Sequence, residues 1–131
     1  MEMYCQFLNA YNAEGDIMAE GRQTTEDRLL KDAYISVYEN GTWRYRQSFF
    51  QSVLTSHELK LKQKTANIAG LQLADLLAHP MRVDVLIDQS RDGCEDGAFG
   101  HQVRQVIAAK YYRNPVDKLV AGYGKVFLGS P

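Results

Sequence analysis

The chain has few cysteines and prolines, and its charges nearly cancel. Its 131 residues include two cysteines, Cys5 and Cys94, and three prolines. Two cysteines are too few for a disulfide framework and lack metal-ligand spacing, so we expect two free thiols in a reducing compartment. Fifteen Lys and Arg against sixteen Asp and Glu give a formal charge of −1. This balance excludes a field over the whole chain that attracts nucleic acid or anionic membranes.

The sequence also lacks a long apolar run. Its longest apolar stretch, Ile68 to Met81, is interrupted by polar residues and by Pro80, whereas a membrane span needs about 20 mostly apolar residues. No basic residue precedes the apolar residues at the N-terminus, as it does in a secretory signal peptide. We therefore expect a cytoplasmic protein with no membrane contact. The length and an apolar content of 45% predict a single globular domain over residues 1–131.

Helical periodicity is present in four segments. Apolar residues at helical spacing predict helices over residues 1–12, 25–40, 66–78 and 99–110. At the second of these, a hydroxyl from Thr24 or Thr25 is expected to cap the first turn, and Asn40-Gly41 to end the helix. The third helix is expected to end or bend at Pro80.

Alternating patterns predict strands over residues 17–20, 43–47, 57–63 and 119–128. Strands that alternate with helices favour an α/β fold. If the two middle strands are neighbours, their basic residues share the face turned away from the core. Such a face binds nucleic acid by releasing counterions; the alternative is an ordinary solvated face. The residues concerned are Arg44, Arg46, Lys60, Lys62 and Lys64.

One acidic residue lies in an apolar setting. The segment Ile68 to Pro80 is apolar on nearly every side, which is typical of a buried helix. Asp75 within it would then need a partner, a metal ion or a raised pKa. Helical spacing places Gln72 and His79 on the same face. The alternative is a structural role, in which Asp75 caps a nearby backbone or pairs with a basic side chain such as Lys64 or Arg22.

The same segment carries a family resemblance. Lys64-x-x-Asn67, followed directly by IAGLQLADLLAHP, resembles the signature of the DUF3800 family, a group of bacterial and phage proteins with a ribonuclease H-like fold. Glu20-x-Arg22 resembles the strand-to-helix step of that family. The segments 99–110 and 122–127 resemble its closing helix and strand. The resemblance begins at about residue 14 and covers most of the chain.

This resemblance implies a fold and a site. The family's acidic first-strand element has no counterpart here, so the chain resembles the C-terminal half of such a domain: a mixed sheet with helices packed on it, and the N-terminal strands missing. The resemblance further implies a two-metal phosphodiester site. Glu20 and Asp75 would be its catalytic residues and its ligands for Mg²⁺ or Mn²⁺. Lys64, Arg22 and Gln72 would bind the substrate.

Two classes of function stay open at this point. One is a metal-dependent nuclease-like enzyme acting on nucleic acid with an incomplete set of carboxylates. The other is a non-catalytic binding or oligomerisation module that keeps only the fold. Missing strands would leave the edge of the 17–20 strand open, and open edges pair with other chains. We therefore expect a homo-oligomer, or pairing with the missing N-terminal half, with Ile17, Met18 or the first helix at the interface.

Overall fold

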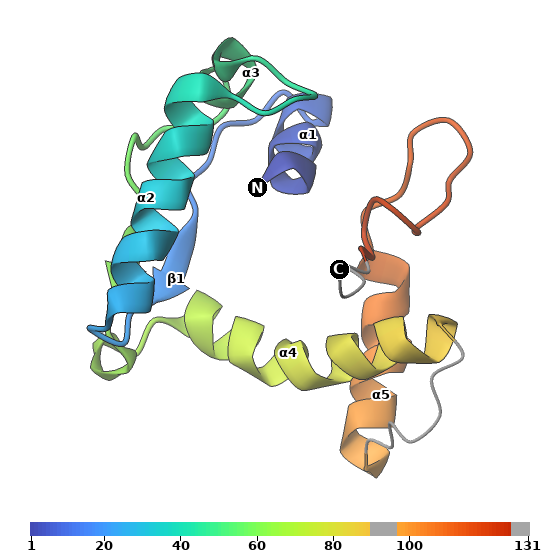
Figure 1. Ribbon diagram of the computed structural model, residues 1–131. Coiled ribbons are helices and arrows are strands. Elements are labelled where there is room, and N and C mark those ends of the chain that lie inside the picture. The colour runs from blue at the N-terminus through green and yellow to red at the C-terminus, as the bar shows by residue number, and fades with distance from the viewer. Residues whose placement is uncertain (90–96, 127–131) are drawn as a thin grey trace. The chain divides into compact units, whose positions relative to one another are not determined.

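The computed structural model describes residues 1–89 and 97–126 (Figure 1). The chain divides into two compact units, Met1–Leu71 and Gln72–Pro131, which are described below one at a time. The expectation of a single domain stays a prediction. None of the helices in the described ranges combines the length and the apolar character needed to cross a membrane.

Unit 1 contains both helices and strands. Its strands β1 (Met18–Glu20) and β2 (Lys60–Lys62) form a parallel pair. The helices are α1 (Glu2–Ala10), α2 (Thr25–Asn40), α3 (Gln47–Gln51) and the 3₁₀ turn η1 (Lys64–Ala66). The predicted α/β character is therefore confirmed. The sheet, predicted to be mixed, is a two-stranded parallel sheet within the described residues.

Helix α2 has the bounds that its sequence predicts. Thr24 is its N-cap residue, and Gly41 follows the last turn with φ of 77°. The amide of Gly41 donates to the carbonyl of Val37 at 2.9 Å. Glycine adopts this left-handed conformation without the steric cost that a Cβ would bring. The sequence was sufficient to predict both ends of this helix, because each end depends on residues next to it in the chain.

The core of unit 1 lies between the helices and the parallel pair. Its fully or nearly buried residues come from α1, α2, α3 and the segment that leads to β2: Cys5, Leu8, Tyr34, Phe50, Val53, Leu54 and Leu59. The Tyr34 hydroxyl donates to the carbonyl of Ser56 at 2.7 Å, and burial raises the pKa of Tyr34 to about 12. Cys5 is a free thiol, as expected, and burial raises its pKa to about 11. Cys94 lies outside the described residues.

The strand expected over residues 43–47 is wrong. Residues 43–45 form a bend, and α3 begins at Gln47. The Thr42 hydroxyl accepts from the amides of Arg44 and Tyr45, and the Thr42 amide donates to the Tyr45 carbonyl at 2.8 Å. These local bonds compete with strand pairing. Trp43 is 94% exposed. The strand expected over residues 57–63 is confirmed only at Lys60–Lys62.

Unit 2 is built on two helices. They are α4 (Ala69–Asp88), whose first residues belong to unit 1, and α5 (Ala98–Ile107), which continues as the 3₁₀ turn η2 (Ala108–Lys110). The final helix is thus confirmed. The prediction of a strand over residues 119–128 is wrong for the residues that the structure describes. They form a turn with one isolated bridge between Ala121 and Lys125. The last two residues of the predicted strand lie outside the described range.

Helix α4 differs from the expected buried helix in two ways. It continues past Pro80 to Asp88, and the Pro80 ring is buried, as is Val83 one turn later. A proline removes one backbone bond, and the buried ring offsets part of that loss. The segment 67–79 is not buried: Leu73 and Leu76 are 55% and 50% exposed. The apolar composition predicted the helix but not its exposure.

The C-terminal turn of unit 2 is tied to α4 by ion pairs. Nζ of Lys125 lies 2.6 Å from Oδ2 of Asp84 and 2.8 Å from Oδ2 of Asp88. The Tyr111 hydroxyl donates to the same Asp84 oxygen at 2.8 Å. The side chains of Lys125 and Asp84 are only 16% and 18% exposed. Burial alone would lower the pKa of Lys125, but the bonds to the two carboxylates outweigh it and raise that pKa.

We expect Lys125→Met to destabilise unit 2 by about 1–3 kcal/mol, because the sheltered Asp84 carboxylate loses its nearest cation, while Nη1 of Arg104 lies 3.9 Å away. The exposed Lys110 of the same unit provides the control, and Lys110→Met should change stability by less than about 0.5 kcal/mol. Because the folded-state pKa of Lys125 is raised, its contribution is complete below the unfolded pKa and is lost as the pH rises through the folded pKa. Chemical denaturation at neutral and alkaline pH measures both effects. Equal stability of the two variants at neutral pH would contradict this role.

Candidate functional site

The predicted residues Glu20 and Arg22 lie in one hollow of unit 1. The hollow has a volume of about 790 Å³ and is lined by Glu20, Arg22, Thr24, Glu26, Asp27, Leu29, Leu30 and Ala33. These residues come from the end of β1, the turn after it and the first half of α2, which lies beside β1 (Figure 1). Glu20 is partly buried and is paired in register with Lys62 of β2.

The turn between β1 and α2 is held by an aspartate rather than by a threonine. Oδ2 of Asp27 accepts from the amides of Arg22 and Gln23 at 2.8 and 2.7 Å. No side-chain hydrogen bond of Thr24 caps α2, so the predicted hydroxyl cap is wrong. The Thr24 side chain instead bonds to Glu26, and this bond lowers the Glu26 pKa. Gln23 has φ of 59°, a costly conformation for a residue with a Cβ.

The other wall of the hollow is apolar and exposed. Leu29 and Leu30 of α2 are 59% and 49% exposed, and Ala33 lies one turn further along. Tyr34 of α2, one turn after Leu30, is buried in the core of unit 1. The apolar residues of α2 are therefore covered at Tyr34 and exposed at Leu29 and Leu30. The helical spacing of the leucines was visible in the sequence, but their exposure was not.

The predicted basic face is not assembled as expected. Arg44 and Arg46 lie in and after the bend of residues 43–45, so they are not cross-strand neighbours of Lys60 and Lys62. Lys60 forms an ion pair with Asp16, whose pKa this bond lowers. Lys64 begins η1 and is exposed. The lysines of β2 thus lie beside acidic residues of the adjoining strand, which weakens the case for a phosphate-binding face.

Asp75 and Gln72 belong to unit 2 and are exposed on α4, together with His79. The expectation that Asp75 sits in an apolar interior is wrong. Its apolar neighbours in sequence, including Leu73 and Leu76, are themselves exposed. Because an exposed carboxylate is stabilised by water, the apolar sequence around Asp75 does not by itself require a metal ion there.

The two predicted metal ligands come from different units of the chain. Glu20 lies in unit 1 and Asp75 in unit 2. Among residues 1–89 and 97–126, no group of three or more His, Cys, Asp or Glu side chains is placed to hold a metal ion. Two-metal catalysis needs several carboxylates around one point. The Mg²⁺ or Mn²⁺ site that the resemblance implies therefore stays a prediction.

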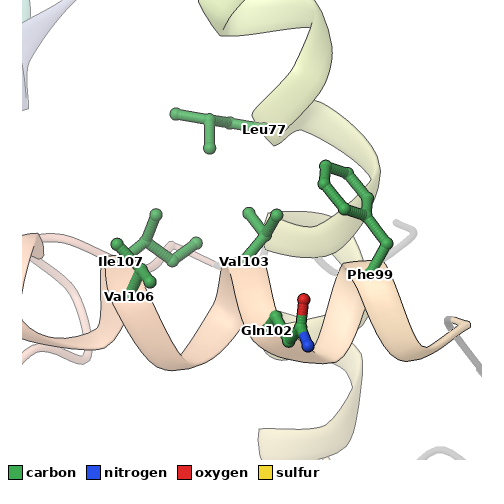
Figure 2. A pocket seen from close by; sticks show the side chains of 6 residues that line it. All are labelled: Leu77, Phe99, Gln102, Val103, Val106 and Ile107. Carbon is green, nitrogen blue, oxygen red and sulfur yellow. The ribbon is translucent and has the colours of Figure 1, made fainter.

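Unit 2 carries an apolar hollow that the sequence did not predict. It has a volume of about 300 Å³ and lies along α5 below Leu77 of α4 (Figure 2). Its lining is Leu77, Phe99, Gln102, Val103, Val106 and Ile107. Phe99 and Val106 are 60% and 70% exposed. Gln102 is its single polar side chain, so this hollow offers packing area and no acid–base chemistry.

Comparisons with models of known protein families, with characterised proteins and with solved structures found no match to this chain. The resemblance to the DUF3800 family therefore stays a prediction.

We expect Asp27→Ala to lower the stability of unit 1 by about 1–2 kcal/mol, because two backbone amides lose their acceptor. Asp32, also exposed on α2, provides a control of the same residue type, and Asp32→Ala should have little effect. Urea denaturation followed by far-ultraviolet circular dichroism compares the two. If both variants unfold at the same urea concentration, Asp27 does not hold the turn.

Proposed function

We propose that this chain is a non-catalytic association module with a DUF3800-like fold, which takes an additional strand from another polypeptide along β1. One observation carries the proposal, namely the open edge of β1 beside the exposed side of α2. In the described residues the sheet has two strands, so β1 is paired on one side only. An unpaired strand edge is a template for another chain.

The orientation of the β1 backbone supports this proposal. The Lys60 amide donates to the Ile17 carbonyl, and the Gly21 amide donates to the Lys62 carbonyl. In a parallel ladder, the residues that bond to the neighbouring strand alternate with residues that face the other way. Met18 and Glu20 therefore direct their amides and carbonyls away from β2. No bond to these groups is present among the described residues, and Met18 is 37% exposed.

Met18→Pro tests whether the open edge is used. Proline at this position removes an amide that points away from β2, so the β1–β2 ladder stays intact. Met18→Val keeps the amide and serves as the control. We expect wild type and Met18→Val to sediment above the 14.9 kDa of one chain, or to gain thermal stability when a peptide of residues 15–22 is added. Met18→Pro should do neither.

If wild type is monomeric at every concentration and the peptide does not change its melting temperature, the association proposal is wrong. Unchanged association of Met18→Pro would also contradict it, provided that the circular dichroism spectrum of the variant matches that of wild type.

A second candidate is the nuclease-like function that the resemblance implies, and the position of Glu20 favours it. Glu20 ends β1, and ligand sites of parallel sheets lie at the carboxyl ends of strands. Arg22 lines the same hollow and supplies a positive charge. This function would require carboxylates beyond those that the described residues bring together.

Titration with Mn²⁺ distinguishes the nuclease-like function from an association module that binds no metal ion. An ion that binds only the folded state raises the melting temperature. On this candidate, Mn²⁺ should stabilise wild type, and the stabilisation should be lost in Glu20→Gln and reduced in Asp75→Asn. Asp32→Asn controls for non-specific binding to exposed carboxylates. Equal shifts in all four proteins, or none in wild type, would remove the metal hypothesis.

A further inference from the structure

We infer that the partner of the β1 edge is a second copy of this chain, paired antiparallel through β1 with Ala19 on the two-fold axis. This inference rests on the proposed association function and names its partner. It follows from three features of unit 1: which backbone groups are open, where the neighbouring charges lie, and where the exposed side of α2 lies.

Among the described residues, only a short part of the β1 edge has unbonded backbone groups, because the backbone on either side of it already forms hydrogen bonds. Before it, the carbonyl of Asp16 accepts from the Tyr4 hydroxyl at 3.2 Å. After it, the amide of Arg22 donates to Asp27. Between these ends, Met18 and Glu20 offer two amides and two carbonyls. A strand pairing that satisfies this edge must therefore use Met18 and Glu20 and extend no further.

Antiparallel pairing about Ala19 meets this requirement. Met18 then lies opposite Glu20 of the second copy, and Glu20 lies opposite Met18 of the second copy. Each such pair exchanges two backbone hydrogen bonds in an antiparallel ladder. All four open groups of each strand are used, and no group that is already bonded is needed. The two Ala19 residues face each other across the axis, where small side chains permit close approach.

The charged residues of β1 and its flanks favour the same register, the one centred on Ala19. Pairing about Glu20 would place the two Glu20 carboxylates directly opposite each other, and it would need the occupied Arg22 amide. Pairing about Met18 would place Glu20 opposite Asp16. Like charges in directly opposed positions destabilise a sheet. Pairing about Ala19 instead brings Arg22 towards Asp16 of the second copy, so the nearest charges beyond the ladder are opposite in sign.

The exposed side of α2 provides the second contact. The hollow formed by the end of β1 and the first half of α2 is lined by Leu29, Leu30 and Ala33 and by no residue of β2. A single peptide strand would cover the edge and leave much of this leucine surface in water. A second copy supplies a strand and an antiparallel α2 together, so that the same leucines meet across the axis. Self-complementary patches of this kind define two-fold dimers.

Cysteine cross-linking tests the register. Directly opposed residues that do not exchange hydrogen bonds have Cα atoms about 4.5 Å apart, which suits a disulfide. In a Cys94→Ser background, Ala19→Cys should therefore oxidise to a covalent dimer. Met18→Cys and Glu20→Cys, whose like residues are two positions apart across the axis, should remain largely monomeric on denaturing gels. Reduced Ala19→Cys should sediment like wild type, which shows that the substitution leaves the assembly intact.

A second pair of variants tests the helix contact without changing the strand. Leu30→Glu and Arg28→Gln each make the chain more negative by one charge, and both positions are exposed on α2. Leu30→Glu should raise the dimer dissociation constant about tenfold or more, while Arg28→Gln should leave it nearly unchanged. Sedimentation equilibrium measures both constants.

The outcomes separate this inference from the proposal on which it rests. If wild type associates and Met18→Pro does not, but Met18→Cys or Glu20→Cys cross-links better than Ala19→Cys, the association function holds and the Ala19 register is wrong. If wild type is monomeric and still binds the peptide of residues 15–22, the edge serves a different polypeptide and a second copy is excluded. If wild type is monomeric and binds no peptide, both fail.

Discussion

The parallel pairing of β1 with β2 is the constraint on which unit 1 depends. The two strands are separated by about forty residues, and their register places Met18 beside Lys60 and Glu20 beside Lys62. Closing so long a loop costs conformational entropy, which α2 and α3 offset by burying the core that they form inside it. The ion pair between Asp16 and Lys60 stands at the start of the ladder. It therefore fixes the register from outside the strands themselves.

The helices could be predicted wherever their ends are determined locally. Helix α2 begins after Thr24 and ends before Gly41 because the cap positions and the turn residues act within a few positions of each end. The bend of residues 43–45 was mistaken for a strand because Tyr45 and its neighbours alternate in polarity. That alternation has another origin: Tyr45 stacks on Phe49 with ring centroids 4.4 Å apart, while Trp43 projects into water. An alternation of polar and apolar residues over only five positions therefore does not distinguish a strand from a bend.

The candidate site was less predictable, because exposure depends on what covers a helix. An apolar segment around Asp75 indicates burial only if another element packs against it, and no local pattern encodes that element. Leu29 and Leu30 show the same dependence. Their helical spacing does not tell whether another element covers them, and both are exposed although Tyr34 of the same helix is buried in the core. In contrast, Glu20 and Arg22 line one hollow because a single residue separates them in the chain.

The open edge and the uncovered leucines have one physical cause, which is a sheet too narrow for the helix beside it. A helix on an α/β sheet usually spans more than one strand, and the apolar residues of α2 are covered at Tyr34 but exposed at Leu29 and Leu30, in a unit with two strands. Filling the hollow with a single large side chain would cover the leucines but leave the amides of Met18 and Glu20 unpaired. Pairing the edge with an isolated strand would satisfy those amides and leave apolar area on α2. The unpaired amides and the exposed leucines are covered together only by a strand that carries an apolar surface of its own. This requirement is the same for a second copy and for an acidic strand of another polypeptide, since each would have to bring backbone groups and side chains in one piece. The two occupants differ in what they place beside Glu20: a second copy brings Met18, whereas an acidic strand would bring another carboxylate. The residue that lies opposite Glu20 therefore decides whether unit 1 serves association or metal chemistry.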